Sequence, residues 1–262
     1  MKRFTILLTT AVILSLGFSF GKSLTAREIM EQNEQMMNTR DERSDLTMKL
    51  INKRGKERKR QVVLYSKTDN QNNDKTLIRF QAPADVKGVG LLSIEEGGQK
   101  NQWLYLPALK RVRRISSSEK TDSFMGSDFS YEDIEQNDLN NYKYSLLREE
   151  NFDGVMCYVI RSIPVDEQVK QETAYSKSDV WVRKDNYISI KVNFYNKKAD
   201  LIKIMNSNDI RPVEGTDKWR AHFIEMQNVN TGHRTELLYK NIIINQGVAD
   251  KYFTQRYLER GR

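Results

Sequence analysis

Few side chains in this sequence stand where they could carry out covalent or metal chemistry. The 262 residues include two histidines, His222 and His233, and a single cysteine, Cys157. A tight turn near residues 228–232 would place His222 opposite positions 238–240, several residues out of register with His233. Because no nearby cysteine completes a ligand set, the sequence disfavours a zinc site and we expect no metal.

The remaining polar candidates have simpler interpretations than catalysis. Residues 116–118 are a run of three serines with no evident base beside them. Glu132 and Asp133 are adjacent on an expected short helix, so their carboxylates point in different directions and suit the first turn of that helix. Asp128 is expected to satisfy backbone donors at the same helix start. The common hydrolase, phosphate-loop, metalloprotease and dinucleotide motifs are absent from the sequence, so we expect neither an enzyme nor a cofactor.

The N-terminus has the pattern of an export signal. Lys2 and Arg3 precede an uncharged apolar run from Phe4 to Phe20, and small residues follow it. This order is typical of a secretory signal peptide. A membrane anchor is the alternative, although a run of about 17 residues is at the lower limit for spanning a bilayer. We expect a signal peptide over residues 1–21, cleaved between about 21 and 26, and one domain over residues 22–262 that is soluble in the periplasm.

The composition fits a folded, exported protein. The hydrophobic fraction is 38% and the aromatic fraction 10%, which argues against a disordered chain. Four prolines and one cysteine exclude collagen-like and disulfide-framework proteins. The formal net charge is +8. Since an exported chain rarely meets nucleic acid, we expect no nucleic-acid partner despite this charge.

The apolar pattern predicts one helix followed by many short strands. A capping box, Thr25-x-x-Glu28, opens a helix from about Ala26 to Met37. The period then drops to two, and a turn at residues 53–56 joins the strands of a hairpin. A short helix within residues 127–137 and a C-terminal helix over 248–259 are also expected. Further strands are expected at residues 76–81, 89–95, 101–106, 110–116, 142–149, 155–163, 178–183, 188–195, 200–210, 219–227 and 235–239. Short strands joined by tight turns indicate an antiparallel sheet that curls or closes.

Several segments resemble the outer-membrane lipoprotein-sorting protein family. The most specific block comprises residues 103–107 (WLYLP), 111–115 (RVRRI) and 124–133 (FMGSDFSYED). Residues 79–83 (RFQAP), Gly88 and residues 253–259 (FTQRYLE) also fit, so the similarity covers about residues 25–262.

The resemblance implies a mainly β (α+β), LolA/LolB-like fold. In that fold a curved, incompletely closed antiparallel β-barrel or half-barrel wraps around a few helices and encloses an apolar cavity. Members of the family are periplasmic, and some are encoded beside RND-type (MMPL) transporters.

Apolar residues alternate along the expected strands, which allows two interpretations. Their faces form either a packed core or, in a half-barrel with little helix to fill it, a groove for acyl chains. Burying hydrocarbon there would contribute about 0.8 kcal/mol per CH₂. The candidate cavity residues are Ile29, Met36, Phe80, Leu92, Trp103, Tyr105, Phe124, Met125, Phe129, Tyr131, Trp181, Phe194 and Phe223.

Two basic segments, residues 53–60 and 110–114, are candidates for docking. Charged hairpin tips are often only solvated, and they discourage edge pairing between sheets. The alternative is that they hold the protein near anionic lipid headgroups or an acidic partner. The candidate docking residues are Lys53, Arg54, Lys56, Arg58, Arg111, Arg113 and Arg114.

Together these features predict a periplasmic carrier for a lipid, a lipoprotein acyl chain or another hydrophobic ligand. The first helix and residues 124–134 would act as a lid or plug, and contact with a membrane surface would be transient. An inner-membrane RND/MMPL-type transporter is a further candidate partner. The alternative function is a non-enzymatic accessory or scaffold subunit of an RND-type envelope transporter.

Overall fold

The computed structural model describes residues 23–71, 73–135 and 138–261. The expected signal peptide over residues 1–21 lies outside the described residues. In the described part of the chain, no helix combines the length and the apolar character needed to cross a membrane.

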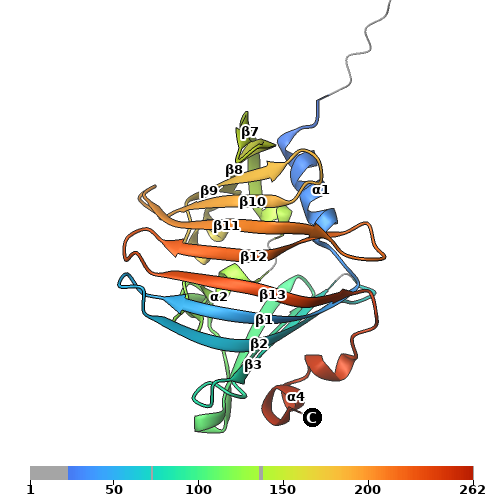
Figure 1. The fold of residues 1–262 in the computed structure, drawn as a ribbon, viewed down its shortest axis with the longest axis vertical. Helices are drawn as coiled ribbons and strands as arrows, with labels where there is room; N and C mark the ends of the chain where they lie inside the picture. Colours follow the sequence, from blue (N-terminus) through green and yellow to red (C-terminus); the bar gives the residue numbers. More distant parts are fainter. Residues whose placement is uncertain (1–22, 72, 136–137, 262) are drawn as a thin grey trace, which may run out of the picture.

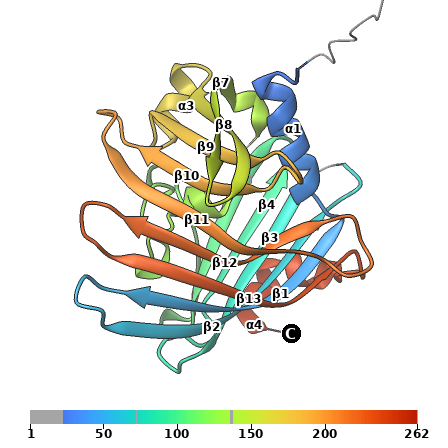
Figure 2. The ribbon, with the colours of Figure 1, turned by 45° about the horizontal axis from the view of Figure 1, so that its top comes forward.

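Thirteen strands in the described chain form a single antiparallel sheet, in the order β6-β5-β4-β3-β2-β1-β13-β12-β11-β10-β9-β8-β7. The strands are β1 Asp41–Ile51, β2 Glu57–Thr68, β3 Asp74–Ala82, β4 Gly90–Glu96, β5 Gln99–Leu106, β6 Arg111–Arg114, β7 Tyr142–Phe152, β8 Val155–Pro164, β9 Lys177–Arg183, β10 Ser189–Tyr195, β11 Leu201–Pro212, β12 Trp219–Asn228 and β13 Arg234–Ile244. The sheet curves strongly (Figure 1), and in the turned view of Figure 2 β3 and β4 pass behind β11 and β12. The two ends of this order, β6 and β7, are not paired with each other, which confirms the expected curved and incompletely closed sheet.

The strand order explains how the concave side is filled. The first and last strands, β1 and β13, pair in the middle of the sheet, with Met48 opposite Leu237. Strands β6 and β7 follow each other in the chain but form opposite edges of the sheet. The connection between them therefore has to cross from one edge to the other. It carries α2 (Tyr131–Ile134), and we call residues 124–134 the central segment.

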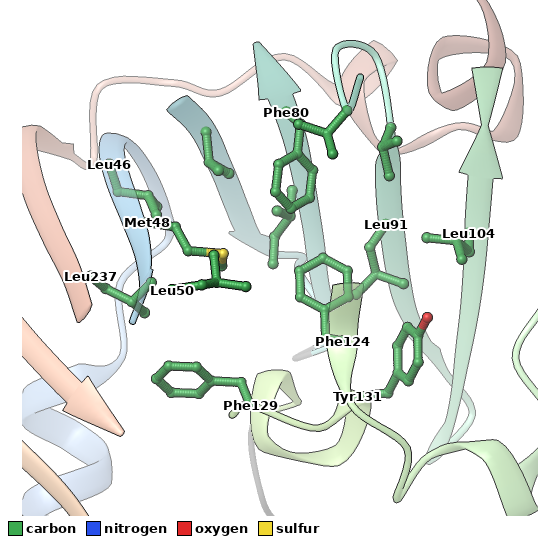
Figure 3. Packing of buried hydrophobic residues seen from close by; sticks show 14 of the residues in the cluster. Leu46, Met48, Leu50, Phe80, Leu91, Leu104, Phe124, Phe129, Tyr131 and Leu237 are labelled. Carbon is green, nitrogen blue, oxygen red and sulfur yellow. The ribbon is translucent and has the colours of Figure 1, made fainter. Parts of the chain in front are cut away.

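The central segment packs into the main core on the concave side of the sheet. The Phe124 ring lies 5.8 Å from that of Phe80 on β3 and 5.6 Å from that of Tyr131, measured between centroids. Both phenylalanines are almost fully buried. Figure 3 shows Phe124, Phe129 and Tyr131 directed at side chains from β1, β3, β4 and β5. The central segment thus forms the layer that covers this part of the concave face.

Helix α1 (Ala26–Met37) begins and ends where the sequence predicts. The Thr25 hydroxyl accepts from the Glu28 amide, and the Glu28 carboxylate accepts from the Thr25 amide, which completes the capping box. Ile29 and Met30 point inward and pack against apolar side chains of β8, β9 and β10. The helix therefore covers the concave side near the β7 end of the sheet (Figure 2).

A C-terminal segment covers part of the convex face. The single helix expected over residues 248–259 is broken into a 3₁₀ turn, Asp250–Phe253, and α4, Gln255–Arg260. Thr254 is extended between them, and its hydroxyl accepts from the Tyr257 amide to cap α4. Leu258 is fully buried against β4, where a Cβ atom on Gly90 would lie only 2.7 Å from it. A further short helix, α3 (Glu167–Glu172), is not among the elements expected from the sequence.

Candidate ligand-binding cavity

A cavity of about 520 Å³ lies on the concave side of the sheet. Its walls come from α1, the central segment and residues of β1–β5 and β7–β12. This volume falls within the range of about 300–1,000 Å³ that is usual for small-molecule sites. The apolar lining side chains are Met30, Met37, Leu64, Phe129, Ile134, Leu139, Pro164, Val180, Val192, Phe194, Met205 and Met226.

One wall of the cavity is a row of apolar side chains that crosses four strands in register. Val180 on β9 lies opposite Val192 on β10, which lies opposite Met205 on β11, which in turn lies opposite Met226 on β12. Side chains directly opposite each other in an antiparallel sheet share one face. The row is therefore continuous, and the Phe194 ring extends it toward Tyr175, 4.8 Å away between centroids.

The central segment is held to this wall by a buried ion pair. Lys203 Nζ on β11 lies 2.9 Å from Asp133 Oδ2, and the two side chains are 14% and 5% exposed. The Tyr175 hydroxyl donates to Asp133 Oδ1 at 2.8 Å. Asp133 also accepts from the Ser130 amide as part of the capping box of α2. Burial and the neighbouring carboxylates Asp133 and Glu132 raise the pKa of Tyr175, so its hydroxyl remains a donor.

Glu132 and Asp133 point in different directions, as their adjacency predicts. Glu132 Oε1 accepts from the Ala174 amide at 3.1 Å, and burial raises the pKa of its carboxyl group. The next carboxylate along the chain, Glu135, pairs with Lys120 at 2.9 Å. These contacts hold the central segment and the residue after it to their surroundings, so Glu132 and Glu135 each have a structural role.

Asp128 has a different role from the one expected. Ser130, and not Asp128, caps α2. The Asp128 carboxylate instead accepts from the Thr235 hydroxyl at 2.7 Å, and its Oδ2 lies 2.6 Å from His233 Nδ1. Because Asp128 lies two residues before the cap, its side chain reaches β13 and not the helix start. It anchors the central segment to β13, two strands away from Lys203 on β11.

The two histidines lie apart, in agreement with the expected register. Phe223 pairs with Leu238, which places His222 well away from the start of β13, where His233 lies. His222 Nδ1 lies near the backbone carbonyl oxygens of Asp209 and Arg220. In the described chain, no group of three or more His, Cys, Asp or Glu side chains could hold a metal ion.

The end of the cavity beneath α1 is polar. Glu34, Asp74, Tyr142 and Tyr144 all line it. Burial raises the pKa of the Glu34 carboxyl group, and the nearby carboxylates of Asp138 and Asp74 add to this, although Arg27 opposes it. Burial also raises the pKa of Tyr142 to about 12. The cavity therefore has an apolar wall and a polar end.

The chain matches one protein-family model and is similar to several solved structures. A model described as an uncharacterized protein family matches residues 72–260. A putative outer membrane lipoprotein-sorting protein domain from Vibrio parahaemolyticus is 34% identical, with a TM-score of 0.82, over 90% of this chain and 98% of that one. The chain belongs to the outer-membrane lipoprotein-sorting family, whose fold is LolA-like. No curated protein matches the sequence.

Two further structures agree with this assignment. A DUF1329 family protein from Desulfovibrio piger is 32% identical, with a TM-score of 0.83, over 89% of this chain and 97% of that one. A LolA superfamily protein from Nitrosomonas europaea has a TM-score of 0.71 over 90% of this chain and all of that one. At 20% identity, the latter likeness supports the fold alone.

Against this family background, the cavity residues expected from the sequence divide into groups. Phe129 and Phe194 line the cavity. Ile29 is buried beneath α1 beside it, whereas Met36 is half-buried near the end of α1, where its carbonyl oxygen accepts from Arg220. Four more residues belong to the packed core that holds the central segment: Phe80, Phe124, Met125 and Tyr131.

The other five expected residues lie on the convex face. Leu92, Trp103 and Tyr105 pack under the C-terminal segment. Trp181 packs in a separate convex cluster, and its ring lies 6.4 Å from that of Phe152. Phe223 alternates with Ile224, which packs against the concave core, and so it faces the other way.

The register explains which residues the sequence analysis missed. Strand β9 carries Val180, Trp181 and Val182 in succession, so both of its faces are apolar and the largest side chain is no guide to the inner one. The structure turns the two valines inward. Val192, Met205 and Met226 line the cavity because of strand pairing, which aromatic content along the sequence does not reveal.

The expected docking residues lie at one end of the strands. Lys53, Arg54, Lys56 and Arg58 are exposed at and beside the β1–β2 turn. Arg111 and Arg114 are exposed on β6, which is separated from β2 by three strands. Arg113 differs, since it pairs with Glu119 at 2.6 Å. The remaining residues of this set are thus available for contact.

Proposed function

We propose that this protein is a periplasmic carrier that holds a lipid, a lipoprotein acyl chain or another hydrophobic ligand in the concave cavity. The observation that carries the proposal is the apolar row Val180–Val192–Met205–Met226 facing an open cavity of about 520 Å³. The name of the Vibrio parahaemolyticus relative, which refers to lipoprotein sorting, supports the same role in the cell envelope.

The lining suits a flexible hydrocarbon chain. Met30, Met37, Met205 and Met226 contribute to it, and unbranched, polarisable methionine side chains adapt to ligands of different shape. Each CH₂ group of the ligand that leaves water contributes about 0.8 kcal/mol. Binding of this kind needs no covalent step.

The polar end of the cavity suits the head of an amphiphile. Glu34 and Asp74 lie at this polar end, whereas the Tyr144 ring packs against the cluster that contains Val180 and Val192 of the apolar row. A ligand with one polar end can then place its chain along β9–β12 and its head beneath α1. Such a ligand satisfies both parts of the lining at once, whereas pure hydrocarbon would leave polar groups without partners.

A fluorescent fatty-acid analogue tests the proposal. Met205→Trp adds a bulky ring to the apolar row and is expected to weaken binding by roughly tenfold or more, about 1.4 kcal/mol. Phe223→Trp makes a similar change on the convex face and is the matched control, expected to bind as the unaltered protein does. Binding that is equal in both variants, or that lipid does not displace, would contradict the proposal.

The transporter-subunit alternative has no separate support. The names of the similar structures given above do not mention a transporter. Retention of a protein partner by delipidated protein would favour that alternative over the carrier.

A further inference from the structure

The turn between β5 and β6 exposes a leucine beside basic residues. Pro107–Leu109 forms a 3₁₀ turn, and Leu109 is 67% exposed. No other large hydrophobic side chain in the described chain is as exposed. Lys110 follows in the left-handed region, with φ of 48°, and the chain then enters β6 at Arg111. The turn therefore presents an apolar tip with two cations directly behind it.

Helix α4 adds two more cations to the same surface. A groove of about 560 Å³ lies between β6 and α4, and it is lined by Lys110, Arg111, Arg256 and Arg260 together with the single carboxylate Glu259. All four cations are exposed. No ion pair among the described residues engages any of them, in contrast to most other arginines of the sheet.

Unpaired cations around an apolar tip complement an anionic lipid surface. An exposed apolar side chain can enter the boundary between headgroups and acyl chains, and flanking lysines and arginines attract anionic headgroups. An acidic protein could pair with the four cations, but it would not explain why the apolar Leu109 side chain is exposed beside them. We propose that the Leu109 turn and the β6–α4 groove together form the surface by which this protein binds anionic membranes.

This surface goes beyond the docking residues expected from the sequence. The sequence identifies Arg111, but Arg256 and Arg260 join it only because α4 packs across the convex face beside β6. The surface is also separate from the cavity, which β6 and α4 do not line. Its role in membrane binding therefore does not depend on which ligand the cavity holds.

Vesicle sedimentation tests the proposal with the chain that starts at Ser23, which includes all the described residues. The vesicles are phosphatidylcholine alone, or phosphatidylcholine with a minority of phosphatidylglycerol. The protein is expected to bind the second kind only, and less as salt rises. Arg256→Gln with Arg260→Gln is expected to lower the partition coefficient by about 30-fold, at roughly fivefold per charge. Leu109→Ser is expected to weaken binding several-fold.

A matched double variant separates local from overall charge. Arg40→Gln with Lys240→Gln removes two exposed cations, one just before β1 and one in the middle of β13, neither of which lines the groove, and is expected to retain most of the binding. Each variant should bind the fatty-acid analogue as the unaltered protein does. Loss of vesicle binding can then be distinguished from a failure of the carrier proposal, which would show as no binding of the analogue by any form of the protein.

Three results would overturn the membrane surface. The first is no preference for anionic vesicles, and the second is an equal loss in both double variants. The third is binding to an acidic polypeptide such as polyglutamate in place of vesicles, which would assign the groove to a protein partner.

Discussion

Asp133 shows how a single side chain can hold the interior of this molecule together. Its carboxylate accepts from the Tyr175 hydroxyl, pairs with Lys203 and accepts from the Ser130 amide in the capping box of α2. With 5% of the side chain exposed, the charge has little water to solvate it. A buried carboxylate of this kind is tolerated only while its partners are present.

Lys203→Met is therefore expected to destabilise the protein by about 3–5 kcal/mol, because it leaves Asp133 buried without a cation. Urea unfolding followed by circular dichroism measures this change. Arg211→Met is the control, since the Arg211–Asp209 pair has side chains that are 61% and 43% exposed. Its loss should stay below about 1 kcal/mol. Equal losses of stability from the two substitutions would show that the Asp133 carboxylate does not depend on Lys203 as a buried charge would.

Glu34 gives a prediction about pH. Burial raises the pKa of its carboxyl group in the folded protein, and Asp138 and Asp74 add to the shift. A raised pKa means that folding favours the protonated form, so stability falls as pH rises through the unfolded-state and then the folded-state value. Glu34→Gln should thus raise the melting temperature at pH 7 but not below about pH 4, where both states are protonated. A gain that persists at acid pH would refute this explanation.

At the scale of elements, the C-terminal segment is an apolar strap across the convex face. Tyr252 stacks on Tyr65 with ring centroids 4.3 Å apart, and Arg79 donates to the Tyr257 and Leu258 carbonyl groups at the end of α4. A cation at a helix C-terminus is favourable because the last carbonyl groups lack helical partners. These contacts fix α4 beside β6.

Leu258→Ala is expected to destabilise the protein by about 2–5 kcal/mol, because the side chain is fully buried and its removal leaves a cavity. Thermal unfolding measures the change. Leu109→Ala, at a side chain that is 67% exposed, serves as the control and should alter stability by no more than about 0.5 kcal/mol. Gly90→Ala places a methyl group against the Leu258 side chain and should also destabilise the protein. Stability unchanged by both Leu258→Ala and Gly90→Ala would mean that α4 is not docked on β4.

The sequence predicts elements better than it predicts their faces. Alternation and turn residues locate the strands, and the Thr25–Glu28 capping box locates α1. The face that each strand turns inward depends on pairing across the sheet, and a shift by one residue reverses it. Trp181, between two inward valines, shows why: local hydrophobicity is the same on both sides of β9.

At the scale of the whole molecule, the strand order creates the cavity. Because β1 and β13 pair at the centre, the edges β6 and β7 are consecutive in the chain, and their connection must cross the concave side. The central segment fills one part of that side and leaves the part beneath α1 and β9–β12 open. The pairing of the two ends of the described fold could not be predicted from local pattern, since it joins residues nearly 200 positions apart, such as Met48 and Leu237.

Native mass spectrometry of the protein purified from its own cell envelope tests the central claim most directly. If the cavity holds a hydrophobic ligand, the spectrum is expected to show the chain together with an adduct of lipid-like mass, and Met205→Trp should reduce that adduct while Phe223→Trp preserves it. A spectrum with the mass of the chain alone, under conditions that retain non-covalent lipid in a known carrier, would contradict the account.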